Sequence, residues 1–165
     1  MSVETLAVAV LTTGGTIDKV YFDATSEFSV GASVVDDLLK AAHVDAPYRV
    51  VEVLRKDSLE IDDEDRARIA TAVAACAERC VIVTHGTDTM TTTGAWLTAI
   101  EGKTIVLTGA LSPARFAKSD ATFNVGMAFA AVQTLAVGVY IVMNGQVFES
   151  GQVQKDSQNN VFVRC

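Results

Sequence analysis

The stretch Val81-Ile82-Val83-Thr84-His85-Gly86-Thr87-Asp88-Thr89 decides the fold that we expect for this chain. Residues 80–83 are apolar and mostly β-branched, a pattern typical of a short strand buried on both faces. A polar turn with one glycine follows, and residues 88–100 then show helical spacing. Such a turn predicts a ligand site at the carboxyl edge of a parallel sheet. The alternative is an ordinary turn in which Thr87 and Asp88 only cap the helix.

Strands and helices alternate along the rest of the chain. We expect further strands at residues 6–11, 48–54, 104–107 and 137–143, and helices starting near residues 34, 62 and 120. The helix capped by Asp62 should bury Ile69, Val73, Ala74 and Ala77. This alternation predicts a single α/β domain over residues 1–165, with three α/β/α layers around a mostly parallel, Rossmann-like sheet.

Two segments fall outside this alternation. Residues 18–30 have no helical periodicity and carry several aromatic side chains, which favours a β-hairpin or a lid. After a tight turn at Asn144-Gly145, residues 149–160 form a polar tail that holds Lys155. Residues 161–163 are expected to add a last edge strand.

Composition excludes several classes of protein. In 165 residues, 50% are hydrophobic, and the net charge of −7 disfavours nucleic acid, whose phosphates need a basic partner. No stretch is apolar enough to span a membrane, and residues 1–9 lack the basic start of a signal peptide, so we expect a cytoplasmic protein. Three cysteines and two histidines form no zinc-ligand pattern, and we expect neither a metal nor another cofactor.

Thr16 is a candidate nucleophile, because it follows Gly14 and Gly15 on a loop with little side-chain bulk. A threonine needs a base, which here would be Lys155 in its neutral form or a tyrosine. Backbone N–H groups at Gly15 or Gly86 could hold an oxyanion. The residues alone also allow Thr16 as a turn hydroxyl, and for Lys155 they favour a solvated tail charge.

Two motifs then point to a family. Thr13-Gly14-Gly15-Thr16-Ile17 and His85-Gly86-Thr87-Asp88-Thr89-Met90 resemble the two signature motifs of the bacterial-type L-asparaginase/glutaminase family. The similarity continues through Val106-Leu107-Thr108-Gly109-Ala110, Ser119-Asp120 with Asn124, and Val142-Met143-Asn144. It covers nearly the whole chain and corresponds to the family's N-terminal domain only.

The resemblance implies a set of roles for residues of this chain. Thr16 would be the acylated nucleophile, Thr87, Lys155 and Asp88 would form a triad, and Ser58 would hold the substrate. Asp88 would also bind the substrate's α-ammonium group, beside Gly15 and Gly86. The implied reaction is hydrolysis of the side-chain amide of asparagine or a related small amide to an acid and ammonia.

Three departures from the family pattern qualify this prediction. Phe28 stands where the family has a lid tyrosine, and because phenylalanine exchanges no proton, we expect Tyr21 to take that role. Leu59 replaces a polar neighbour of Ser58, which weakens capture of an amino-acid backbone. The family's C-terminal domain, which completes the site of a neighbouring subunit, has no counterpart here. We therefore expect a homodimer or a higher homo-oligomer that covers the open pocket.

Two other functions fit the same residues. The chain could be a non-catalytic module that binds a small ligand, or a partial subunit of an amidotransferase on the same fold. The enzymatic prediction requires five residues to converge in one pocket at the carboxyl edge of the sheet, namely Thr16, Ser58, Thr87, Asp88 and Lys155.

Overall fold

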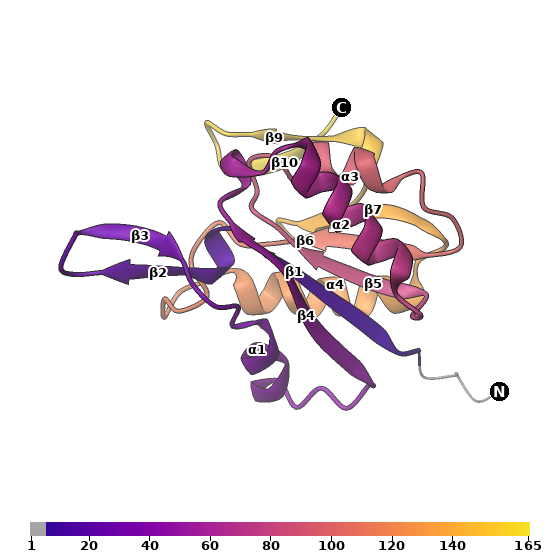
Figure 1. Cartoon of the computed structure of the whole chain (residues 1–165), viewed down its shortest axis with the longest axis horizontal. Helices are drawn as coiled ribbons and strands as arrows, with labels where there is room; N and C mark the ends of the chain where they lie inside the picture. The colour runs from indigo at the N-terminus through magenta and orange to yellow at the C-terminus, as the bar shows by residue number, and fades with distance from the viewer. Residues whose placement is uncertain (1–5) are drawn as a thin grey trace.

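The computed structural model describes residues 6–165, which are built around a six-stranded sheet in the order β4-β1-β5-β6-β7-β8 (Figure 1). The parallel strands are β1 (Val8–Gly14), β4 (Tyr48–Lys56), β5 (Cys80–Thr84), β6 (Thr104–Thr108) and β7 (Gly138–Met143). Only β8 (Gln146–Glu149) runs antiparallel within this sheet, after a turn in which Asn144 and Gly145 both have positive φ. The mostly parallel sheet is confirmed.

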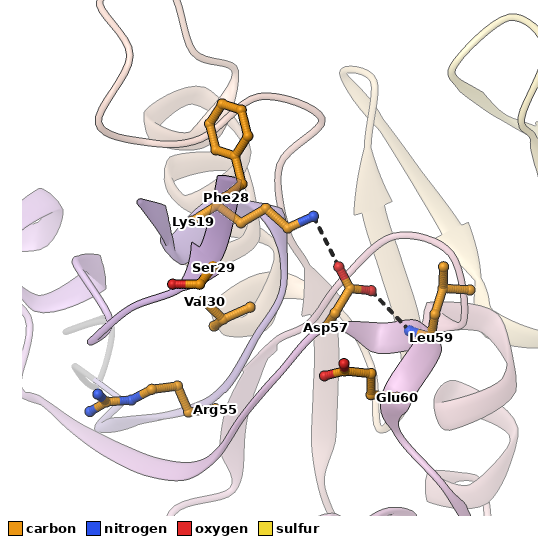
Figure 2. Close-up of a pocket in the computed structure, with 8 residues that line it drawn as sticks. All are labelled: Lys19, Phe28, Ser29, Val30, Arg55, Asp57, Leu59 and Glu60. Carbon is orange, nitrogen blue, oxygen red and sulfur yellow. Dashed lines mark hydrogen bonds and ion pairs between the residues drawn. The ribbon is translucent and has the colours of Figure 1, made fainter. Parts of the chain in front are cut away.

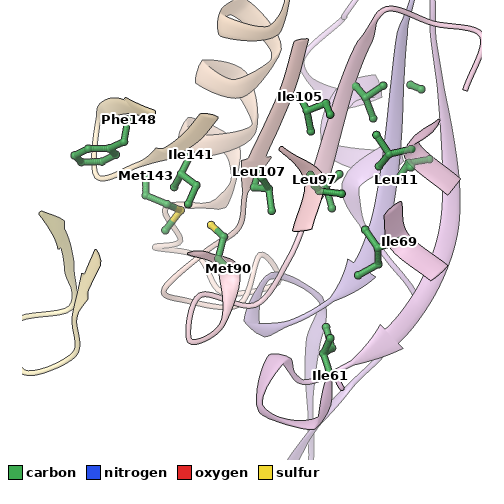
Figure 3. Close-up of a cluster of buried hydrophobic side chains, with 14 of the residues drawn as sticks. Leu11, Ile61, Ile69, Met90, Leu97, Ile105, Leu107, Ile141, Met143 and Phe148 are labelled. Atoms are coloured by element: carbon green, nitrogen blue, oxygen red, sulfur yellow. The ribbon is translucent and has the colours of Figure 1, made fainter. Parts of the chain in front are cut away.

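Helices cover both faces of the sheet. Helices α2 (Asp63–Ala75) and α3 (Met90–Leu97) pack on one face, and α1 (Val35–Ala41) and α4 (Ala121–Thr134) pack on the other. Successive residues of β1 face opposite layers, so that Leu11 joins the α2–α3 side (Figure 3) and Val10 the α1–α4 side. Burial on both faces explains the unbroken apolar runs, and the three-layer prediction is confirmed.

The helix boundaries correct two predictions. Asp62 caps α2 through a reciprocal pair of hydrogen bonds with Asp65, as expected. Ala74 and Ala77 are nevertheless exposed: Ala74 lies on the outer side of the helix, and Ala77 follows its end at Ala75. Helix α3 begins at Met90 instead of Asp88, and its N-cap Thr89 makes no side-chain capping bond. Thr87 and Asp88 therefore lie in the turn before the helix and do not cap it.

Two small hairpins lie outside the main sheet. Strands β2 (Lys19–Phe22) and β3 (Glu27–Val30) form the expected hairpin, which projects from the body in Figure 1. Strand β10 (Val161–Arg164) pairs with β9 (Val153–Asp156) and not with the edge of the main sheet, so the predicted edge strand is wrong. The β9–β10 hairpin is anchored because Val153 and Phe162 join the core on the α2–α3 side. No helix within residues 6–165 is long and apolar enough to cross a membrane.

Candidate active site

The strand order places a crevice between β1 and β5. From β1 the chain crosses to β4 on one side, and the next strand, β5, pairs with β1 on the other side. The loops at the carboxyl ends of β1 and β5 therefore lead in opposite directions, which opens a crevice of the kind in which open α/β sheets bind ligands. The two loops are those that carry Gly15 and Gly86.

Gly15, Gly86 and Ser58 pack closely at this crevice. The backbone of Gly15 lies against that of Gly86, which in turn lies against the Ser58 side chain. Gly15 has φ +89°, and a β-carbon there would collide with the backbone nitrogen of Gly86. A β-carbon on Gly86 would lie 2.6 Å from Cβ of Ser58, which is buried in the short turn Ser58–Glu60 after β4. The Thr89 hydroxyl donates to the Ser58 carbonyl at 2.8 Å and joins the same loops. The ends of β1, β4 and β5 are thus held in direct contact.

Lys155 reaches this site from β9. Its Nζ donates to Oγ1 of Thr87 at 2.8 Å and to Oδ1 of Asp88 at 2.7 Å. The Lys155 side chain is only 12% exposed, against 43% for Asp88. The structure therefore brings these three residues together as predicted, and the alternative of a solvated tail charge for Lys155 is wrong.

Thr16 lies at the start of the turn Thr16–Asp18, directly after Gly15. Its side chain is half-buried, and its hydroxyl makes no hydrogen bond within the part of the chain that the structure describes. Thr16 thus lies next to the contact between Gly15 and Gly86, and its hydroxyl is free of hydrogen bonds to residues 6–165.

Tyr21 is not brought onto Thr16. It pairs in register with Phe28 across the β2–β3 hairpin, and the two ring centroids are 5.1 Å apart. Within residues 6–165 the Tyr21 hydroxyl makes no hydrogen bond with Thr16, and the ring is 45% exposed. Tyr21 and Phe28 are therefore neighbours on one exposed hairpin.

His85 has a structural role that the sequence did not reveal. Its Nδ1 lies 2.7 Å from the Gly86 carbonyl, and its Nε2 lies 2.8 Å from the Thr93 hydroxyl. Burial lowers the pKa of His85 to about 4, so the ring is neutral at pH 7. Its contact with the Gly86 carbonyl helps to fix the position of Gly86. Its position directly after the buried strand was the one available signal. Thr13 has a related role, because its hydroxyl donates to the Thr84 carbonyl and links β1 to β5.

Comparison with known proteins identifies the family. The family described as "Asparaginase, N-terminal" matches residues 7–162, nearly the whole chain. This chain belongs to the asparaginase family. The two signature motifs quoted from the sequence are those that line the crevice between β1 and β5 of this family member.

The asparaginase relatives are longer than this chain. It is 30% identical over 162 residues to a glutaminase-asparaginase from Acinetobacter glutaminasificans, covering 90% of this chain and 49% of that protein. For a probable periplasmic L-asparaginase from Haemophilus influenzae, the identity is 28%, over 93% of this chain and 47% of the relative. The chain spans about half the length of the curated relatives it matches.

Solved structures agree with the fold. The thermostable L-asparaginase from Thermococcus kodakarensis superposes with a TM-score of 0.81 at 26% identity, over 96% of this chain and 51% of that one. A probable cytoplasmic L-asparaginase from Campylobacter jejuni gives a TM-score of 0.80 at 27% identity, with the same coverage. The α/β fold predicted from the sequence is therefore that of L-asparaginases over about half their length.

Proposed function

We propose that this asparaginase-family chain hydrolyses the side-chain amide of asparagine or of a related small amide, with Thr16 as the nucleophile. The observation that carries this proposal is the hydrogen-bonded set Thr87–Lys155–Asp88, which lies beside the contact between Gly15 and Gly86. A lysine bonded to both a hydroxyl and a carboxylate can relay a proton without a metal.

In the proposed reaction, Oγ1 of Thr16 forms a bond to the amide carbon and gives up its proton to the relay. The carbonyl electrons move onto oxygen, where the N–H groups of Gly15 or Gly86 stabilise the charge. Collapse breaks the C–N bond, and the protonated nitrogen leaves as ammonia. Water then gives a proton through Thr87 to a neutral Lys155 and attacks the ester carbon. The bond between that carbon and Oγ1 of Thr16 breaks, Oγ1 takes a proton back from the relay, and the acid leaves.

Binding without turnover is the second candidate, and the placement of Tyr21 favours it. With Phe28 at the family's tyrosine position and Tyr21 on the projecting hairpin, Thr16 has no proton partner within bonding distance among residues 6–165. A partial subunit of an amidotransferase is a third hypothesis, and no contact within residues 6–165 favours it over the other two. The cytoplasmic location stays a prediction, because one named relative is described as periplasmic and another as cytoplasmic.

Ammonia release from asparagine and glutamine tests the proposal. The substitutions Thr16→Ala, Thr87→Ala and Lys155→Met should each lower kcat by about a hundredfold or more, the scale expected for losing a nucleophile or its base. Lys103→Met is the matched control, because Lys103 donates to the carbonyls of Cys76 and Glu78 and has no contact with the site. It should lower stability and leave kcat unchanged. A Thr16→Ala variant with normal turnover would show that another residue attacks.

A further inference from the structure

The loop after β6, residues 109–119, holds the turn that carries Thr16. The Ala114 N–H donates to the Ile17 carbonyl at 3.1 Å, and Nη1 of Arg115 donates to the Asp18 carbonyl at 3.0 Å. Ile17 and Asp18 are the two residues that follow Thr16 in its turn. The position of the candidate nucleophile therefore depends on a side chain that lies 97 residues after Asp18 in the sequence.

Arg115 also joins the two ends of the β2–β3 hairpin. Its Nη1 donates to the carbonyl of Asp18, directly before β2, and its Nη2 donates to the carbonyl of Ala32, just after β3, at 3.0 Å. The Gly31 N–H donates to the same Asp18 carbonyl at 2.9 Å. A planar guanidinium presents its N–H groups in a fixed fork, so one side chain sets the spacing between the two ends of the hairpin.

The side chain of Asp18 adds a further bond at the same point. Its carboxyl group is buried, and Oδ1 accepts from the Val34 N–H at 3.1 Å. Burial raises the pKa of Asp18, while the bond from Val34 and the positive charge of Arg115 oppose this rise. Asp18 thus joins the base of the hairpin to the N-cap of α1 with its carboxyl group and to Arg115 with its carbonyl.

The loop that carries Arg115 is itself fixed by hydrogen bonds. The Asp120 carboxylate accepts from the N–H groups of Leu111 and Ser112 at 2.9 to 3.1 Å. The Ser119 hydroxyl donates to the Ser112 carbonyl at 2.8 Å. These bonds hold the two ends of the loop together at the start of α4, so Arg115 extends from a firm support.

The hairpin has a second contact, which is weaker by its exposure. Lys19 and Asp57 form an ion pair at 2.9 Å between β2 and the turn after β4 (Figure 2). Both residues line a cavity of about 410 Å³, together with Phe28 and Leu59. Their side chains are partly exposed, so water and salt reduce the attraction. This ion pair holds only one strand of the hairpin, whereas Arg115 holds both ends.

Building on the proposed amide hydrolysis, we propose that Arg115 is a positioning residue for Thr16 and for the β2–β3 hairpin. Its bonds go to backbone carbonyls and not to the proposed reacting groups, so it acts through the turn that carries Thr16. With both ends bonded to one guanidinium, the hairpin turns only as a single body. Thr16 and Tyr21 then share one fixed point of attachment on the loop after β6.

Hydrogen exchange of single amides tests this role without a substrate. The N–H groups of Gly31 and Val34 both donate to Asp18, so they report whether the base of the hairpin stays closed. In Arg115→Ala, both should exchange about tenfold faster or more than in the wild type, as measured by NMR on the whole chain. Since Arg115 is exposed, the substitution should leave folding intact.

Steady-state ammonia release from asparagine is the second measurement. Arg115→Ala should lower kcat by about tenfold or more, because a small displacement of a reacting group such as Thr16 is costly. KM should stay within about threefold, since Ser58 and Asp88, the candidate substrate-binding residues, lie on other loops. A role in global stability alone would not separate kcat from KM in this way.

Arg49→Ala is the matched control, because Arg49 also makes two hydrogen bonds, both to Glu78, and lies near the start of β4. It should change neither the exchange rates nor kcat. Equal exchange of Gly31 and Val34 in Arg115→Ala and wild type would overturn the inference, and so would an unchanged kcat in an active enzyme. If the wild type releases no ammonia, the proposed hydrolysis fails separately, and the exchange rates still decide whether Arg115 holds the hairpin.

Discussion

At the scale of single residues, Tyr21 is the candidate proton partner of Thr16, because Phe28 has no hydroxyl. Both rings stand on the same hairpin, in contact with each other, so a movement of the hairpin toward Thr16 would carry both. If Tyr21 supplies the phenol, Tyr21→Phe should lower kcat by about a hundredfold or more, because a hydroxyl is lost and little packing changes. Steady-state ammonia release measures this effect.

Tyr140→Phe is the control for this substitution, since its hydroxyl donates to the Ala136 carbonyl, away from the site. Equal rates for wild type and Tyr21→Phe in an active enzyme would exclude Tyr21. In that case, Phe28→Tyr should raise a weak activity by restoring the family's phenol.

His85 predicts a pH dependence of stability. Burial lowers its folded-state pKa to about 4, below the ordinary 6.5, so the unfolded chain binds the proton more tightly. The stabilisation from a neutral His85 is therefore fully present above pH 6.5 and is lost as the pH falls through 4. Between pH 7 and pH 5 the free energy of unfolding should fall by about 2 kcal/mol.

Urea unfolding at several pH values measures this slope. His43→Asn should keep it, because His43 is exposed and its φ of 53° suits asparagine. His85→Asn should lower the stability and flatten the slope between pH 6.5 and 4.5. An unchanged slope in His85→Asn would assign the titration to another group.

At the scale of elements, the site depends on contact between the loops after β1 and β5. Gly15→Ala should push them apart, since the new methyl group would meet the backbone of Gly86 while φ stays at +89°. Gly102→Ala is the control, with φ +72° and open space around the added carbon. It should cost only the backbone strain, about 1 to 2 kcal/mol.

Gly15→Ala should cost more than this control and should also reduce kcat, because the candidate oxyanion donors move. Thermal unfolding and ammonia release measure the two effects. Equal stability losses in both variants would mean that the two loops adjust without strain.

At the scale of the whole molecule, we propose that the 165 residues fold as one domain and associate through the hairpin face. Tyr21, Phe28 and Phe116 are each 45–49% exposed there, and Phe28 lies 6.0 Å from Phe116 between ring centroids. Exposed aromatic clusters of this kind commonly mark interfaces. Light scattering should therefore show a homodimer or a larger oligomer.

Phe116→Lys should weaken this association by placing a charge within the aromatic face. A monomer over a wide range of wild-type concentrations would contradict the prediction.

Much of the fold and part of the site follow from local sequence pattern. Unbroken apolar runs such as residues 80–83 predict strands buried on both faces, and alternation with helices requires them to be parallel. Parallel strands end at one edge, so the Thr and Gly residues after β1, β5 and β6 had to gather there. The hairpin over residues 19–30 and the cap at Asp62 were likewise visible in the sequence.

Long-range packing decided the rest. The sequence alone left Lys155 in a polar tail, 68 residues from Thr87. The burial of Val153 and Phe162 against the α2–α3 side, with the hydrogen bond from the Phe162 N–H to Oδ1 of Asn144, holds the β9–β10 hairpin over the site. The same kind of contact joins Lys19 to Asp57 and so forms a cavity between Phe28 and Leu59. No local pattern encodes these positions, because they depend on which surfaces distant segments bury together.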